Sequence, residues 1–429
     1  MNNKKYQLSN KYALKKLNVF VFNVILSYIN LLLLTFIFSI TVFTHPTYAE
    51  IYYIATSGAD SNNGSMDSPW GTLNHAQAQL SPGDTLYVRG GTYTQQCVHY
   101  STWTASGGAS DRVTISGYQN EEAIFDGDQG LSCGGGFIYD IRDAQYITIK
   151  NLEFTNYKNS LISLLDNCSG WIFDNLYIHE IGLTPSAHVS SITISGSSDI
   201  IIRNCTMVNV GNSHEHHHIY AGANTYNWEI YNNYLAHSSG ACIHGWHGPG
   251  LNGAEIYNNI ITDSYFGIIF GDGAQNLKIF NNTLVNNDYG LDFNHTGQDD
   301  TSGVSTTVVK NNIVVGGDGF RIGAHNLDDV TEDYNLYFPT MDTDDRGANS
   351  ITANSSFVDQ SGDDFHIRSD SGAIDRGVTI ESVRDDLDGI LRGQSGFYDI
   401  GAYEYIGGIL TTTPSRPQGF RVKESQPPP

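Results

Sequence analysis

The chain has 429 residues, of which 40% are hydrophobic and 16% are charged, and it contains 45 glycines. This composition is too apolar for a disordered chain, and its many glycines and aromatic residues favour strands and tight turns over a helical bundle. The 22 basic and 45 acidic residues give a formal net charge of −23. Such a balance argues against non-specific nucleic-acid binding, which needs a basic surface, and we expect no nucleic-acid partner.

The first 49 residues have the pattern of an export signal. Five lysines and no acidic residue lie in residues 1–16, a long apolar run follows over residues 18–44, and Ala49 ends a small-x-small exit. This pattern predicts a signal peptide that is cleaved after Ala49, with an uncleaved membrane anchor as the alternative because the run is long. We expect a secreted or cell-surface monomer with no stable membrane insertion after cleavage.

The cysteines give little information about partners. The sequence has five of them and no CxxC pair, so a structural zinc site is not expected. An odd number in an exported chain leaves at least one thiol unpaired. Cys97–Cys133 is one candidate disulfide, and the sequence does not decide the pairing.

The middle of the chain is a repeat. Short segments such as IKNLEF, IYNNYL and IFNNTL recur every 23 to 30 residues and alternate apolar with polar residues. A repeat of this length with short strands is typical of a β solenoid. Asparagines stacked at equivalent turns would hydrogen-bond from coil to coil and satisfy backbone groups there. The marker residues of the repeat are Asn151, Asp174, Asn204, Asn232, Asn258, Asn281, Asn311 and Asn335.

This repeat, over about residues 110–340, resembles the right-handed parallel β-helix of the pectate-lyase-like superfamily. Residues 51–93 are similar to the N-terminal entry of secreted β-helix proteins, with a short helix near Leu73–Leu80 that would cover the open end of the solenoid. We therefore expect an all-β chain with a parallel β-helix over residues 50–340. Residues 341–405 resemble the closing segment of exported bacterial β-helix proteins, and residues 406–429 have the composition of a flexible tail.

The second strand of each repeat predicts one outward face. Side chains alternate across a strand, so the neighbours of a central apolar residue point out together. The central residues are Ile192, Ile219, Ile243, Ile268, Leu291 and Phe320. The outward row that follows from this alignment is Thr193, Tyr220, His244, Ile269, Asp292 and Arg321, flanked by rows that contain His218, Trp246 and Asn294.

The resemblance implies that this face binds glycans, and its side chains suit a lyase. β-Elimination on a uronate needs a base for the proton beside the sugar carboxylate and a group that neutralises that carboxylate. We expect His244 to be the base, Tyr220 the acid for the leaving oxygen, and Arg321 with His218 the carboxylate ligands. Further substrate contacts are expected from Trp246, Asp292, Asn294 and His247. The expected substrate is an acidic polysaccharide, and calcium assists many β-helix lyases that the chain resembles.

Three alternatives remain open. C5 epimerisation begins with the same proton abstraction, but the Asp-Pro-His-Asp motif of alginate epimerases is absent. Glycoside hydrolysis needs a carboxylate pair, and Asp292 has only Asp272 and Asp288 as flanking candidates. A non-catalytic glycan-binding surface protein is the third, since β-helices also serve as adhesins.

The segment HEHHHIY over residues 214–220 carries a metal hypothesis. His214, His216 and His218 would lie on one side of an extended strand and could bind a transition metal, although a polar loop facing a glycan is the more expected structure.

Two other charged motifs are expected to be structural. The acidic run Asp385–Asp388 before Gly389 is expected to be a turn rather than a calcium loop, because no bidentate Glu follows at the required distance. Lys278 lies in phase with Glu229 and Glu255, which predicts an ion-pair ladder rather than a catalytic base.

Overall fold

The computed structural model describes residues 15–18, 20–31, 49–94, 96–128, 136–184, 188–246, 250–271, 273–293, 304–322, 329–339 and 347–407. The chain divides into two units, residues 1–48 and 49–429. In the first unit, residues 15–18 and 20–31 are helical. Within the described ranges, no helix combines the length and the apolar character that a membrane crossing requires. Residues 32–48 of the predicted export signal lie outside the described residues.

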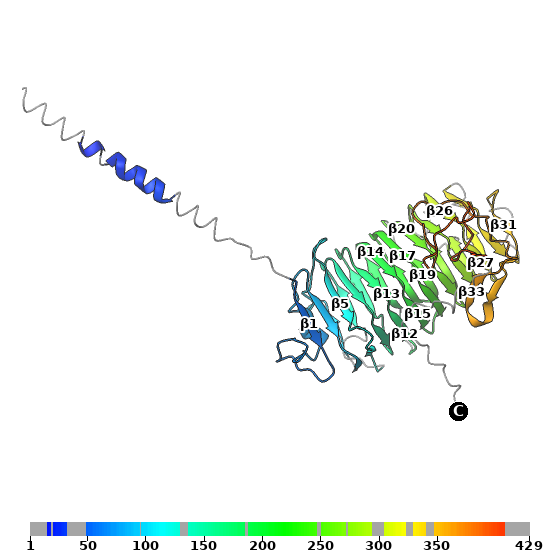
Figure 1. Ribbon diagram of the computed structural model, residues 1–429, viewed down its shortest axis with the longest axis horizontal. Coiled ribbons are helices and arrows are strands. Elements are labelled where there is room, and N and C mark those ends of the chain that lie inside the picture. The colour runs from blue at the N-terminus through cyan, green and yellow to red at the C-terminus, as the bar shows by residue number, and fades with distance from the viewer. Residues whose placement is uncertain are drawn as a thin grey trace, which may run out of the picture. The chain divides into compact units, whose positions relative to one another are not determined.

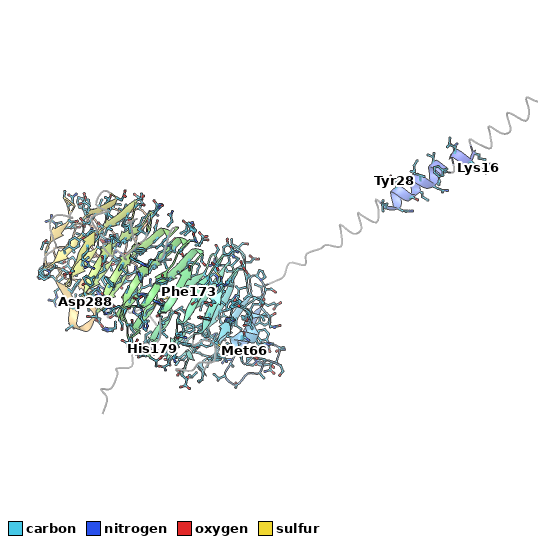
Figure 2. The ribbon with its side chains drawn as sticks, turned by 180° about the vertical axis from the view of Figure 1, so that it is seen from behind. Lys16, Tyr28, Met66, Phe173, His179 and Asp288 are labelled. Atoms are coloured by element: carbon cyan, nitrogen blue, oxygen red, sulfur yellow. The ribbon has the colours of Figure 1, made fainter. Side chains whose placement is uncertain are left out.

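The second unit is a solenoid of parallel strands. Successive coils contribute strands to three sheets, so neighbours within a sheet are separated by a full coil in the sequence. Figure 1 shows these strands following one another in chain order from β1 at one end to β31 at the other. Figure 2 shows the solenoid from behind, with Met66 among the first coils, Phe173 near the middle and Asp288 among the later coils.

Three sheets form the walls of the solenoid. Sheet A contains β1 (Ile51–Ile54), β2 (Thr85–Val88), β5 (Val113–Gly117), β8 (Ile147–Lys150), β11 (Ile172–Asp174), β14 (Ser198–Arg203), β17 (Tyr226–Tyr231), β20 (Asn252–Tyr257), β23 (Lys278–Phe280), β26 (Thr307–Lys310) and β29 (Val330–Asp333). Sheet B contains β4 (Val98–His99), β7 (Ile138–Ile141), β10 (Ile162–Leu165), β13 (Val189–Ser195), β16 (His216–Ala221), β19 (Ala241–Gly245), β22 (Phe266–Phe270), β25 (Tyr289–Phe293) and β28 (Phe320–Ile322). Sheet C contains β3 (Gly91–Thr94), β6 (Ala123–Asp126), β9 (Glu153–Thr155), β12 (Tyr177–Ile181), β15 (Thr206–Val210), β18 (Tyr234–Ser238), β21 (Ile260–Thr262), β24 (Thr283–Val285), β27 (Ile313–Val315), β30 (Leu336–Phe338) and β31 (Ile351–Thr352).

Stacked apolar side chains fill the interior. In sheet B the predicted central residues face one another across successive strands, as in the pairs Ile219 with Ile243 and Ile268 with Leu291. All of them are buried, and even Phe320 at the end of the row is only 5% exposed. Because each coil buries its apolar side chains against the coils on both sides, removal of this surface from water stabilises the whole stack.

Two lines of asparagine follow the turn between sheets A and C, and the predicted single line coincides with the first of them except in two coils. The first line has left-handed backbone, with φ near 57° at Asn232 and 54° at Asn258. Asparagine tolerates this conformation better than most residues, which accounts for its recurrence. Asp174 and Asn335 do not belong to this line, because the left-handed residues in those coils are Asn175 and Tyr334.

The second line lies one residue further along and is buried. Asn259 donates from its backbone N and from its Nδ2 to Oδ1 of Asn282, at 3.0 and 2.9 Å. The same pattern joins neighbouring coils along the set Asn233, Asn259, Asn282, Asn312 and Asn335. These side chains satisfy backbone groups that stacking would otherwise leave unbonded.

Both ends of the solenoid carry additional structure. Helix α2 (Leu73–Gln77) begins after Thr72, whose Oγ1 accepts from His75 N at 3.1 Å. Its buried residues Leu73 and Ala76 belong to the main core, as expected of the predicted capping helix. Near the C-terminus, β32 (Phe357–Asp359), η1 (Gln360–Gly362) and β33 (Asp364–Ile367) form a small antiparallel hairpin.

The chain after this hairpin returns along the later coils. The buried Arg392 donates to Glu404 at 3.0 Å and to Oδ1 of Asn258 at 2.7 Å. Asp386 Oδ1 accepts from the backbone N of Asp388 at 2.9 Å and of Ile390 at 2.8 Å, so the acidic run forms the predicted turn.

Two further expectations concern cysteines and Lys278. Cys97 is disulfide-bonded, whereas Cys168, Cys205 and Cys242 are free and buried. Cys133, the candidate partner, lies outside the described residues.

Lys278 forms an ion pair with Glu255 across adjacent strands of sheet A, which confirms the predicted ladder.

Candidate functional site on sheet B

The predicted outward row exists on sheet B. The register sets Tyr220 opposite His244 and His244 opposite Ile269, and the row continues through Asp292 to Arg321. Tyr220 and His244 are half-buried, and the Arg321 side chain is 31% exposed. The row therefore lies on the outer face of strands β16 to β28, as the alignment of the repeats required.

Three rings meet where β16 and β19 run side by side. Tyr220 lies edge-on to His244, with ring centroids 5.3 Å apart and an interplanar angle of 88°. His217, which the sequence analysis did not select, lies 5.8 Å from Tyr220, and its Nε2 is 2.9 Å from Nδ1 of His244. A phenol and two imidazoles therefore share one surface, which is a set of groups suited to proton transfer.

His217 is buried between the strands and remains neutral. Its Nδ1 accepts from the backbone N of Ala241 at 3.1 Å. Burial, together with the neighbouring His244, holds the pKa of His217 well below its ordinary value of 6.5. Nothing in a period-2 alignment singles out this residue, because it lies three positions before Tyr220 and strict alternation would direct it to the opposite face.

Trp246 extends the site toward the end of the strands. Its ring lies 5.8 Å from that of His244. A Cβ added at Gly271 on the next coil would come within 2.1 Å of the indole, so only glycine leaves room for this ring position. Trp246 therefore lies beside His244, and its expected contact with substrate stays a prediction.

Farther along the row, Arg321 is held by two side chains. It forms an ion pair with Asp292, and its guanidinium lies 3.8 Å from the ring centroid of Tyr289. The Asp292 side chain has no exposed surface. The expectation that Asp292 contacts substrate directly is therefore wrong; it orients Arg321, which is the accessible member of this pair.

His218 does not lie on the outer face of sheet B, and the expectation that it binds a sugar carboxylate is wrong. The residue is fully buried, and its Nε2 is 2.8 Å from Ala236 O on β18. The alternation of side chains is interrupted within β16, because His217 lies beside Tyr220 while His218 is buried, and sequence spacing alone could not reveal this. His247 and Asn294, the remaining expected contacts, lie outside the described residues, as does Asp272.

The proposed histidine metal set is not assembled. His214 is exposed and stacks on Tyr265, with centroids 3.8 Å apart, whereas His216 is buried and accepts from Asn212 N at 3.1 Å. With His218 bonded elsewhere, the three imidazoles do not converge. Among the described residues, no group of three or more His, Cys, Asp or Glu side chains could hold a metal ion.

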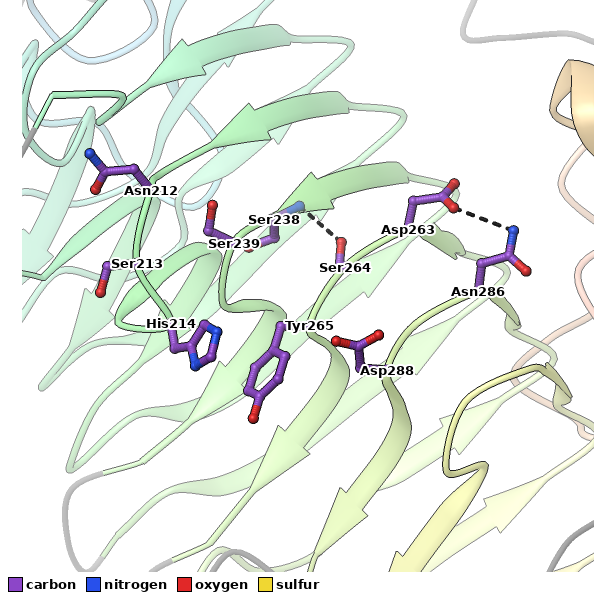
Figure 3. A pocket seen from close by; sticks show the side chains of 10 residues that line it. All are labelled: Asn212, Ser213, His214, Ser238, Ser239, Asp263, Ser264, Tyr265, Asn286 and Asp288. Carbon is purple, nitrogen blue, oxygen red and sulfur yellow. Dashed lines mark hydrogen bonds between the residues drawn. The ribbon is translucent and has the colours of Figure 1, made fainter.

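A polar pocket opens where the chain enters these strands. It encloses about 560 Å³ and is lined by Asn212, Ser213, His214, Ser238, Ser239, Asp263, Ser264, Tyr265, Asn286 and Asp288. Figure 3 shows His214 beside Tyr265, with Asp288 on the other side of that ring. Two internal hydrogen bonds brace the lining: Ser238 N donates to Ser264 Oγ at 2.9 Å, and Asn286 Nδ2 donates to Asp263 Oδ1 at 3.3 Å. Hydroxyl, amide and carboxylate groups around an aromatic ring are suited to bind a sugar.

Comparison with known proteins agrees with this architecture. A family model for the Pel9A-like right-handed β-helix region matches residues 52–330. The crystal structure of pectate lyase Pel9A superimposes with a TM-score of 0.53 at 17% identity, covering 83% of this chain and 96% of that one. The predicted right-handed parallel β-helix is thereby confirmed.

Two curated relatives match shorter stretches. Pectate lyase PEL9 of Emericella nidulans is 32% identical over 114 residues, which are 24% of this chain and 27% of that protein. The uncharacterized protein YwoF of Bacillus subtilis is 29% identical over 98 residues, which are 22% of this chain and 20% of that protein. The chain matches less than a third of the length of either relative.

Proposed function

Because the chain belongs to the Pel9A-like right-handed β-helix family, we propose that it is a secreted polysaccharide lyase that cleaves an acidic, uronate-containing glycan by β-elimination. In this reaction the C5–H bond and the C4–O bond of the uronate break, and a C4–C5 double bond forms. The proton lost from C5 is balanced by one delivered to the leaving oxygen.

The observation that carries this proposal is the cluster of Tyr220, His244 and His217 on adjacent strands. The Tyr220 and His244 rings are 5.3 Å apart, and both belong to half-buried side chains on the outer face of sheet B. A sugar bound across β16 and β19 would meet a phenol and an imidazole together. Proton-transfer groups of this kind typically contribute about 10²- to 10⁴-fold to a rate.

Arg321 would act on a different sugar from the one that reacts. It lies three strands along from His244, which at the ordinary strand spacing is roughly 14 Å. Its guanidinium, oriented by Asp292 and Tyr289, would pair with the carboxylate of a neighbouring uronate in the bound chain. The polar pocket at the start of these strands would bind the hydroxyls of further sugars.

A panel of polyuronates, each incubated with the full chain and followed by ultraviolet absorbance, tests the proposal. We expect at least one polymer to yield unsaturated products, and we expect His244→Ala to lose this activity by about 10²-fold or more. The matched control is His179→Ala, since His179 pairs with Glu153 at 3.1 Å on sheet C and is not on sheet B.

Saturated products from every cleaved polymer would contradict elimination and favour hydrolysis. Loss of C5 configuration without cleavage would favour epimerisation. Binding without any chemical change would support the non-catalytic alternative.

A further inference from the structure

The two histidines of the cluster form a chain of hydrogen bonds whose direction is fixed by the backbone. The N–H of Ala241 can only donate, so Nδ1 of His217, 3.1 Å away, must accept and carries no proton. A neutral imidazole has one protonated nitrogen, and His217 is buried and neutral. Its proton is therefore on Nε2.

The direction of the His217 hydrogen bond also fixes the direction of the one to His244. His217 Nε2 is 2.9 Å from Nδ1 of His244. Because the proton lies on His217 Nε2, this nitrogen donates and His244 Nδ1 accepts. The ring proton of His244 then lies on Nε2, and a nitrogen that carries a proton in a neutral ring cannot accept another.

We propose that His217 is a positioning residue that holds His244 as its Nε2–H tautomer, so that His244 donates a hydrogen bond to the uronate and Tyr220 takes the C5 proton. This inference rests on the proposed function and reverses the expected roles, in which His244 was the base. A neutral imidazole donor stabilises the charge that develops on the sugar carboxylate as the proton leaves C5. His244 Nε2 is shielded from solvent, so a bound sugar must displace what covers it.

Tyr220 completes the reaction without another reagent. As its phenolate, it takes the proton from C5 while the electron pair of that bond forms the double bond and the C4–O bond breaks. The phenol then returns the same proton to the leaving oxygen. Tyr220 ends in its starting form, His244 keeps its proton throughout, and atoms and charge balance.

Two substitutions of His217 distinguish a residue that sets the tautomer of His244 from one that only stabilises the fold. In His217→Gln, the amide oxygen can accept from Ala241 N while the amide N–H₂ donates to His244, so the direction is preserved. In His217→Glu, the carboxylate only accepts and requires a proton on His244 Nδ1. We expect the Glu variant to lose on the order of 10²-fold in kcat with little change in KM, and the Gln variant to retain most of the activity.

Nitrogen-15 NMR of histidine-labelled full chain reports the tautomers directly and needs no substrate. We expect His244 to be protonated at Nε2 in the wild type and in His217→Gln, and at Nδ1 in His217→Glu. Protonation of wild-type His244 at Nδ1 would overturn the inference, as would full kcat in a Glu variant with the inverted tautomer. If no uronate is cleaved at all, the proposed function fails, and the spectrum still decides the tautomer.

The pH profile gives an independent readout in the wild type. With a phenolate base, kcat rises toward the ordinary phenol pKa of about 10. A rate that rises near the ordinary imidazole pKa of about 6.5 and then stays level would instead identify a histidine as the base.

Discussion

His218 is a buried imidazole whose contribution is to stability. Its Nε2 bonds Ala236 O at 2.8 Å, and no part of the residue is exposed. Burial lowers the pKa of His218 to about 4, from an ordinary value of 6.5. The folded chain therefore keeps this ring neutral at pH values where the unfolded chain protonates it.

We expect His218→Gln, which retains an N–H donor, to weaken the pH dependence of stability. As the pH falls from 7 to 4, the unfolded wild type gains a proton at His218 that the folded state binds only near pH 4, so the free energy of unfolding decreases. The difference between the ordinary pKa of 6.5 and the folded-state pKa of about 4 corresponds to a loss of about 3 kcal/mol in the free energy of unfolding. Urea unfolding of both proteins at the two pH values measures the difference, and equal losses would contradict this account.

At the residue scale, the sequence predicted the exposed members of the row but not their neighbours. Tyr220, His244 and Arg321 follow from simple alternation along aligned strands. His217 and His218 depart from that alternation. The His218 ring is held inside by Ala236 O and the His217 ring outside by Ala241 N, and both of these backbone atoms belong to the next coil, which the spacing within one repeat does not reveal.

Among the structural elements, the turn between sheets A and C depends most on single side chains. Asn282 lies in the middle of the buried ladder: its Oδ1 accepts from Asn259, its backbone N donates to Asn312, and its Nδ2 donates to Ile256 O at 2.9 Å. Each bond joins different coils, so the ladder fixes their register as well as satisfying their backbone.

Replacement of Asn282 by Ala should destabilise the solenoid by about 3 kcal/mol or more, because it removes the acceptor of the buried Asn259 N–H groups and one donor to the buried carbonyl of Ile256. Chemical unfolding measures the change. The control is Asn74→Ala on the exposed side of α2, for which we expect about 1 kcal/mol or less. A loss for Asn282→Ala no larger than that of the control would mean that the ladder does not carry the turn.

The sequence located this turn and most of its left-handed line, but it wrongly assigned Asp174 and Asn335 to that line. The repeated Asn-Asn pair places one asparagine at the left-handed position and the next in the hydrogen-bonded ladder, as at Asn281 and Asn282. Where a coil has only one asparagine at this turn, the sequence does not indicate whether that residue belongs to the left-handed line or to the buried ladder. Asn335 continues the buried line, whereas Asn175 belongs to the left-handed one.

For the whole molecule, the net charge of −23 opposes the proposed anionic substrate at long range. Salt screens this repulsion, since the Debye length falls from about 30 Å at 0.01 M to about 8 Å at 0.15 M ionic strength. We expect kcat/KM on a polyuronate to rise by a factor of about 3 or more over this range, mainly through KM. Short oligouronates, with fewer charges, should respond less. A decrease in kcat/KM with salt would mean that local cations such as Arg321 dominate the approach.

The mass of the cleavage products tests the central claim most directly. β-Elimination by the sheet B cluster leaves a new non-reducing end that is one water lighter than the end left by hydrolysis. We predict that every new non-reducing end that the wild-type chain creates in a polyuronate is this lighter end, and that Tyr220→Phe creates none. New non-reducing ends that have gained water, or undiminished cleavage by Tyr220→Phe, would contradict it.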